Sequence, residues 1–150
     1  SINHNSVPDL TFRFDQLYGW TETGDDLIMI DHTTGAVTVV GDSGVSSSGS
    51  GTAADTDGTI WFFPGRVNGS LYTIDPVTGV GTEGPALSGG TYDNINSAVW
   101  YDGTLYAVDT QDLGSALSLQ VLVTVDTNTG VMTSLFAIPT GISSLATYVH

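Results

Sequence analysis

One nine-residue pattern occurs three times along this chain of 150 residues. Each copy is a short apolar and β-branched run followed by Asp-x-x-Thr-Gly, and the copies occupy residues 27–35, 71–79 and 122–130. Their final glycines lie 44 and 51 residues apart (79 − 35 and 130 − 79). A repeat of this length predicts several similar units that bury their apolar surfaces against one another.

The repeated pattern itself predicts a β-hairpin. An aspartate side chain caps the turn, and the glycine takes the positive φ that precedes the returning strand. Gly35, Gly79 and Gly130 should therefore all have φ > 0. Because an aspartate occurs at the same place in every copy, we interpret these three carboxylates as turn caps rather than as separate active sites. They are Asp31, Asp75 and Asp126.

A second hairpin precedes the first in each repeat. Residues 53–62 match residues 98–107, and an Asp-Gly pair marks the turn in both. The earliest copy, at 10–19, keeps Asp15 and lacks the glycine. Two hairpins give four strands per unit, and no segment has a helical periodicity. The sequence thus predicts one all-β domain over 1–150, with three four-stranded antiparallel units at about 8–45, 46–90 and 91–140.

These linked motifs resemble the blades of secreted bacterial β-propeller-like repeat proteins, with a unit of the type Leu-Tyr-x-Ile-Asp-x-x-Thr-Gly. The resemblance covers nearly the whole chain. It implies an extracellular or cell-surface location, and it carries over no catalytic residues, because such families include adhesive, scaffolding and sugar-binding members. Propellers usually have about four to eight blades. We therefore expect three blades to be completed by self-association, into a closed ring or a filament.

Two expectations follow for packing. Alternation along the strands places Ile28 with Ile30, Tyr72 with Ile74, and Val123 with Val125 on one buried face of each blade. Residues 141–150 should form an extra strand, the first of a further blade. Such an apolar strand needs a partner, which we expect to be the first blade at 10–14 or another subunit.

The charge balance excludes several partners. Sixteen acidic residues face only Arg13 and Arg66, and the formal net charge is −14. Nucleic acids and anionic membrane surfaces attract clustered Lys and Arg, so neither suits this chain. The chain has no cysteine, which excludes disulfides and thiolate chemistry.

Aromatic residues are the best candidates for ligand contact. Trp61, Phe62 and Phe63 are adjacent on one predicted strand, so their rings must point to both faces of the sheet. The favoured interpretation is that the rings fill the space between blades. The alternative is that one or two of them stack on a sugar or anchor a partner.

A metal site is considered at Asp55 and Asp57, which alternate before Gly58 as at the start of a calcium loop. The bidentate glutamate expected downstream is missing, so a plain Asp-Gly turn is favoured and calcium is the only cofactor we consider. Glycoside hydrolysis needs two carboxylates at a defined separation. The sequence singles out no such pair, although Glu22 and Glu83 are its only glutamates.

The sequence therefore favours a non-enzymatic extracellular structural or interaction module that self-associates by strand pairing or blade completion. A carbohydrate-binding module that uses exposed aromatic rings is the alternative. A propeller-type hydrolase with its site at a central channel is the weakest hypothesis, because so small a chain would have to build that channel from subunits.

Overall fold

The computed structural model describes residues 6–65, 69–90, 94–112 and 118–146. Within these ranges it contains strands and turns and no helix, so no described helix is long and apolar enough to cross a membrane. The strands form three four-stranded antiparallel sheets, which confirms the all-β prediction. We call these sheets blades 1, 2 and 3 in chain order.

The strands follow the chain order within every blade. Blade 1 consists of β1 (Leu10–Arg13), β2 (Gln16–Trp20), β3 (Asp26–Ile30) and β4 (Val37–Asp42). Blade 2 consists of β5 (Gly51–Ala54), β6 (Ile60–Phe63), β7 (Ser70–Ile74) and β8 (Gly81–Ala86). Blade 3 consists of β9 (Ile95–Tyr101), β10 (Thr104–Asp112), β11 (Ser118–Val125) and β12 (Met132–Ile138).

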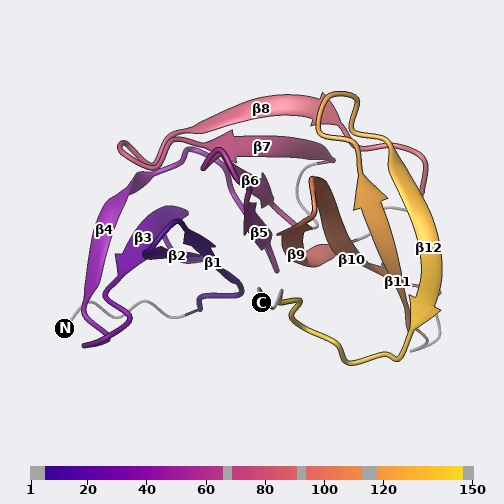
Figure 1. Ribbon diagram of the computed structural model, residues 1–150, viewed down its shortest axis with the longest axis horizontal. Coiled ribbons are helices and arrows are strands. Elements are labelled where there is room, and N and C mark those ends of the chain that lie inside the picture. Colours follow the sequence, from indigo (N-terminus) through magenta and orange to yellow (C-terminus); the bar gives the residue numbers. More distant parts are fainter. Residues whose placement is uncertain (1–5, 66–68, 91–93, 113–117, 147–150) are drawn as a thin grey trace.

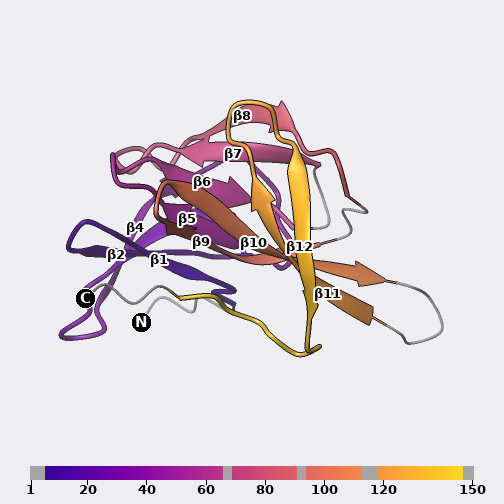
Figure 2. The same cartoon turned by 45° about the vertical axis from the view of Figure 1, so that its right-hand side comes forward.

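The blades stand side by side around a common centre (Figure 1). The first strand of each blade, β1, β5 or β9, lies nearest the centre, and the last strand, β4, β8 or β12, lies at the periphery. From the side, the paired far ends of β10 and β11 project beyond the rest of blade 3 (Figure 2). Blade 2 thus has a blade on each side, whereas blades 1 and 3 each have one face without a neighbouring blade.

The repeated turns adopt the expected conformation. Gly35, Gly79 and Gly130 have φ of 72°, 80° and 73°, as predicted. The aspartate of each turn accepts hydrogen bonds from two backbone amides that follow it, as Asp126 does from Asn128 and Thr129 at 2.8 and 3.0 Å. The Thr33 hydroxyl also donates to Asp31. These bonds favour the ionised carboxylate and lower the pKa of Asp31, with the Thr33 hydroxyl as the largest cause, and the backbone amides lower the pKa of Asp75 and Asp126.

Two apolar clusters hold the blades together. Between blades 1 and 2, the rings of Trp20 and Phe62 lie 4.0 Å apart, centroid to centroid, and both are fully buried. Between blades 2 and 3, the cluster is built from smaller residues with Phe63 among them. The sheets therefore meet face to face through the alternating side chains of their strands.

The burial prediction holds for five of the six named residues. Tyr72, Ile74, Val123 and Val125 face the preceding blade and are buried, and Ile28 is buried as well. Ile30 is only half-buried, because blade 1 has no preceding blade to cover it. Ile28 is covered instead by local packing: Val7, Leu10 and Ile28 converge on the space above Gly19.

The strand predicted at 141–150 is not formed over 141–146, and residues 147–150 lie outside the described residues. The segment leads from β12 back toward the innermost strands (Figure 1). The side-chain amide of Gln120 donates to the Ile142 carbonyl at 2.7 Å and accepts the Ile142 amide at 2.9 Å. The Leu145 amide donates to Ser97 Oγ at 2.8 Å. Side-chain hydrogen bonds therefore replace the ladder that a strand would make.

Candidate functional sites

The centre of the molecule contains a buried carboxylate. Asp9, directly before β1, is 7% exposed and accepts three backbone amides. Its Oδ1 takes the amide of Leu10 at 3.0 Å, and its Oδ2 takes those of Thr52 at 2.8 Å and Ala98 at 3.4 Å. One side chain thus joins the innermost strands of all three blades. Burial raises its pKa to about 6, although the three amides act in the opposite direction.

A small cavity of about 200 Å³ lies near this centre. It is lined by apolar residues and one threonine, and it carries no carboxylate: Leu10, Thr11, Phe12, Ala54, Ala98, Val99, Trp100, Leu145 and Ala146. A glycosidase needs two carboxylates on opposite sides of the scissile bond. The lining of this cavity does not supply that pair. Its chemistry suits an apolar contact better than hydrolysis.

Blade 1 presents an apolar face to solvent. Strand register places two rows across this face, because residues paired across strands point the same way. One row is Leu10, Gly19, Ile28 and Val39, and the other is Phe12, Leu17, Ile30 and Val37. Leu10 is 47% exposed and Phe12 is 56% exposed. We call this surface the open face of blade 1.

Blade 3 has a corresponding open face on its far side. One row across it is Val99, Tyr106, Thr124 and Thr133, and the next is Ser97, Val108, Leu122 and Phe136. Phe136 is 60% exposed, whereas Val108 and Ser97 are buried where residues 142–146 cross. The face therefore combines apolar residues with threonine and serine, and it is partly covered near the centre.

The equivalent faces inside the molecule are buried. The row of Phe12, Leu17, Ile30 and Val37 in blade 1 corresponds by register to Ala54, Ile60, Ile74 and Gly81 in blade 2. Ile60 is 0% exposed and Ile74 is 3% exposed, because they pack against blade 1. The open face of blade 1 thus has the composition of an interface between blades.

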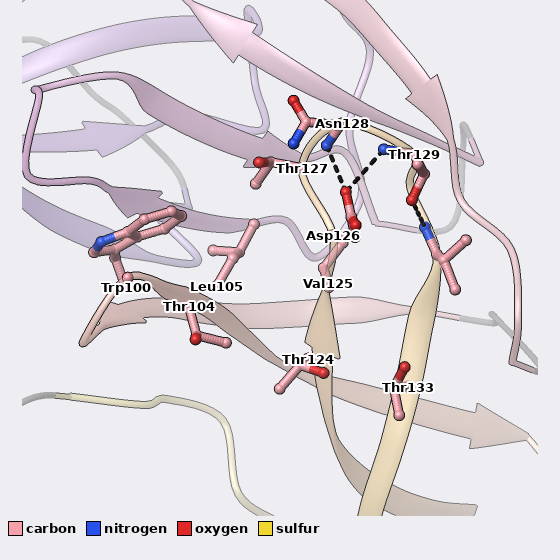
Figure 3. A pocket seen from close by; sticks show the side chains of 12 residues that line it. Trp100, Thr104, Leu105, Thr124, Val125, Asp126, Thr127, Asn128, Thr129 and Thr133 are labelled. Carbon is pink, nitrogen blue, oxygen red and sulfur yellow. Dashed lines mark hydrogen bonds between the residues drawn. The ribbon is translucent and has the colours of Figure 1, made fainter.

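A cleft of about 560 Å³ lies beside the Asp126 turn (Figure 3). Threonines from three strands and the turn line it together with Trp100 and Asn128; they are Thr104, Thr124, Thr127, Thr129 and Thr133. The Trp100 indole Nε1 is buried and has no hydrogen-bond partner among the described residues. This wall offers hydroxyls and one amide for neutral hydrogen bonds, beside the ionised Asp126 carboxylate and the ring of Trp100.

The aromatic residues singled out in the sequence lie between blades. Phe62 and Phe63 are fully buried, one in each interblade cluster, so neither ring has a face open to a ligand. Trp61 is half-buried, and its Nε1 donates to Asp55 Oδ2 at 3.0 Å. The adjacent rings point to both faces of the sheet and fill the space between blades.

The candidate metal residues form a turn. Asp55 Oδ1 accepts the amides of Asp57 and Thr59 at 3.0 and 2.9 Å, and its other oxygen takes the Trp61 indole. Both oxygens of Asp55 are therefore engaged by the protein. In the described parts of the chain, no three acidic or histidine side chains are grouped as a metal site.

The two glutamates are also engaged locally. Glu22 accepts the amide of Gly49, and Glu83 accepts the hydroxyl of Ser70 at 2.8 Å. Each carboxylate thus stabilises its own blade or the link that follows. His4 and His150 lie outside the described residues, and the His32 ring packs edge-on against Phe12 at 5.9 Å.

Two features were missed in the sequence. Asp9 carries no local signal, because its partners Thr52 and Ala98 lie 43 and 89 residues away. The second feature has a signal in the sequence, because a Ser-Gly or Thr-Gly pair follows the outermost strand of every blade. Its glycines are Gly44, Gly89 and Gly141, with φ of 71°, 86° and 93°.

No protein-family model and no curated protein sequence matches the chain. Solved structures do. An α-L-arabinofuranosidase from Clostridium thermocellum matches with a TM-score of 0.61 at 13% identity, over 93% of this chain and 56% of that one. The WD40 β-propeller domain of Doa1 matches with a TM-score of 0.50 at 12% identity, over 91% of this chain and 55% of that one. The fold is that of a β-propeller, and the chain spans a little over half the length of both structures.

Proposed function

We propose that this protein is a non-enzymatic interaction module, acting outside the cell, that completes a propeller by self-association. In this proposal the open face of blade 1 packs against the open face of blade 3 in a second copy. A two-fold pair makes this contact twice and leaves neither face in water. The fold supports the proposal, because propeller blades bury their faces against one another around a ring.

The observation that carries the proposal is the burial of equivalent positions. Ile74 of blade 2 is 3% exposed against blade 1, whereas Ile30, at the same place in blade 1, is half-buried. Leu10 and Phe12 on that face are largely exposed. Leaving such a surface in water costs about 25 cal/mol for every Å² of apolar area. A neighbouring blade removes that cost.

The proposal is tested by sedimentation velocity of the 150-residue chain over a range of micromolar concentrations. We expect a species of twice the 15.6 kDa chain mass. Phe12→Ser should weaken the pair, because burying a phenylalanine contributes about 1.5–3 kcal/mol and a two-fold interface contains it twice. Kd should rise at least about tenfold.

Val77→Ser is the matched control. Val77 is 81% exposed in the blade 2 turn, away from both open faces, so the loss of its exposed apolar side chain should leave Kd unchanged. A folded wild-type chain that stays monomeric at every concentration would contradict the proposal. Equal weakening by both substitutions would show that non-specific hydrophobic association, rather than contact at the open face, forms the pair.

Carbohydrate binding is the second candidate function, and the cleft beside Trp100 favours it. The ring of Trp100 and the hydroxyls of five threonines suit a neutral sugar, which stacks on aromatic rings and forms hydrogen bonds through its hydroxyls. The arabinofuranosidase among the similar structures makes arabinose-containing oligosaccharides a sensible first probe. We expect their binding to change tryptophan fluorescence, and Trp100→Phe to abolish the change. A folded protein with no response across a broad glycan array would remove this candidate.

A further inference from the structure

The blades are joined at the periphery by a contact that occurs twice within the chain. At each junction, the turn glycine of one blade approaches the end of the outermost strand of the blade before it. The Ser-Gly pair that follows that strand supplies a carbonyl to the next blade. Both halves of this contact recur in the sequence, so its geometry can be compared between junctions.

The junction between blades 1 and 2 is built on glycines. A Cβ placed on Gly79 would stand 2.5 Å from the carbonyl oxygen of Gly41, so no side chain fits there. The amide of Gly81 then donates to the carbonyl of Ser43 at 3.0 Å. Blade 2 thus rests its turn directly on the backbone of blade 1.

The junction between blades 2 and 3 repeats this arrangement. A Cβ on Gly130 would collide with the carbonyl of Ala86, and the amide of Met132 donates to the carbonyl of Ser88 at 2.7 Å. A parallel bridge between Ser88 and Val131 adds a second backbone contact. Gly79 and Gly130 are consequently buried at their junctions.

Each end of the molecule carries one unused half of the same contact. Gly35 is exposed, and a Cβ placed there would meet no described residue within 4 Å. At the other end, Thr140 and Gly141 follow β12 after one residue, as Ser88 and Gly89 follow β8. Thr140 and Gly141 are exposed. Gly141 has a positive φ of 93°, as Gly44 and Gly89 have φ of 71° and 86°.

We infer that Thr140 and Gly141 of one copy dock on the Gly35 turn of a second copy, where the Thr140 carbonyl accepts the amide of Val37. Val37 stands two residues after its turn glycine, as Gly81 and Met132 do. This inference rests on the proposed self-association and specifies its contact. Because one molecule carries both halves at opposite ends, a two-fold pair forms two identical junctions and closes.

A second copy suits this surface better than an unrelated partner. It presents the same two halves that already meet within the chain, which are a turn glycine at one end and a Thr-Gly pair at the other. Its charge acts against the pairing, because each copy has a formal net charge of −14. The junction itself uses backbone groups and apolar faces, so added salt should screen the repulsion and strengthen the pair.

The test substitutes asparagine at Gly35, because asparagine tolerates the left-handed conformation and adds a side chain that the docked backbone would exclude. Gly44→Asn is the matched control: its φ of 71° equals the 72° of Gly35 within one degree, and a Cβ there also meets nothing within 4 Å. Light scattering after size exclusion should show dimers for the wild type and Gly44→Asn. Gly35→Asn should raise Kd at least tenfold while circular dichroism stays unchanged.

The outcomes separate the two proposals. A monomeric wild-type chain would overturn both. A wild-type dimer that Gly35→Asn leaves intact would overturn the docking contact and keep self-association. Open-ended polymers of the wild type would overturn the closed pair.

Discussion

Blade 1 and blade 2 have the same strand order, the same turns and equivalent apolar rows, yet they differ in what covers them. In blade 2 the row through Ile60 and Ile74 is buried against blade 1. In blade 1 the row through Leu17 and Ile30 meets no preceding blade and stays half-buried. The turn glycines differ in the same way: Gly79 is pressed against backbone, and Gly35 meets nothing within 4 Å.

The difference shows that the apolar pattern of a blade alone does not bury its face. Burial of that face requires a neighbouring blade. In repeat proteins, much of the stability belongs to the interfaces between neighbours. The open face of blade 1 is therefore an interface without its partner. Substitutions at equivalent positions of the two blades should separate what a blade contributes alone from what its neighbour adds.

The largest expected difference is at Ile74 and Ile30, which are the same residue at equivalent positions. Ile74→Ala should lower the free energy of unfolding by about 2–5 kcal/mol, because it leaves a cavity between two blades. Ile30→Ala should cost less than half as much in dilute solution, where no second copy covers it. Urea unfolding followed by fluorescence measures both. Equal losses would show that blade 1 is covered in some other way.

The pH dependence of stability tests the role of Asp9 at the centre, where its carboxylate accepts one backbone amide from each blade. The pKa of Asp9 is about 6 in the folded chain against an ordinary value of 3.8, so the folded state binds more protons between these values. The unfolding free energy should fall as pH rises from about 4 to about 6, by up to about 3 kcal/mol. Asp9→Asn should remove this slope.

Asp31→Asn is the control for that measurement. Asp31 has a lowered pKa in the folded state, so its contribution to stability is present above its ordinary pKa and is lost at more acidic pH. Its replacement should leave the slope between about pH 4 and 6 in place. A slope that persists in Asp9→Asn would assign the titration to another group.

Turn substitutions should give a smaller effect of the same kind. Gly79→Asn forces a side chain into the backbone of blade 1 and should cost about 1–3 kcal/mol. Gly35→Asn, at nearly the same φ, should change the stability of the isolated chain by less than about 0.5 kcal/mol. Thermal unfolding below the dimer Kd measures the pair. A large loss at Gly35 would mean that its turn is constrained within the single chain.

Local chemistry explains why the hairpins were predictable from the sequence. Each turn needs an aspartate, which accepts the amides two and three residues after it, and a glycine at positive φ. All of these residues lie within one stretch of five. The alternation that places Tyr72 and Val123 on a buried face is local too. The sequence could therefore predict the strands, their turns and the number of blades.

Features that depend on distant partners could not be predicted in this way. Ile30 has the pattern of a core residue, but its burial depends on a blade on its far side. The segment at 141–146 has strand-like residues, yet the Gln120 side chain takes both backbone groups of Ile142. For the aromatic residues at 61–63, the sequence favoured packing between blades and left ligand contact open as the alternative, and the packing of adjacent blades buries Phe62 and Phe63.

Disulfide trapping tests the central claim most directly, because the chain has no cysteine of its own. Ser88 and Val131 form a bridge between blades 2 and 3, and Thr140 and Ala36 are their counterparts at the two open ends. Under mild oxidation, the Ser88→Cys, Val131→Cys chain should crosslink internally and remain monomeric on a non-reducing gel. The Ala36→Cys, Thr140→Cys chain should run as a covalent dimer with no higher ladder. Monomers of that second chain, with the first fully oxidised, would contradict the account.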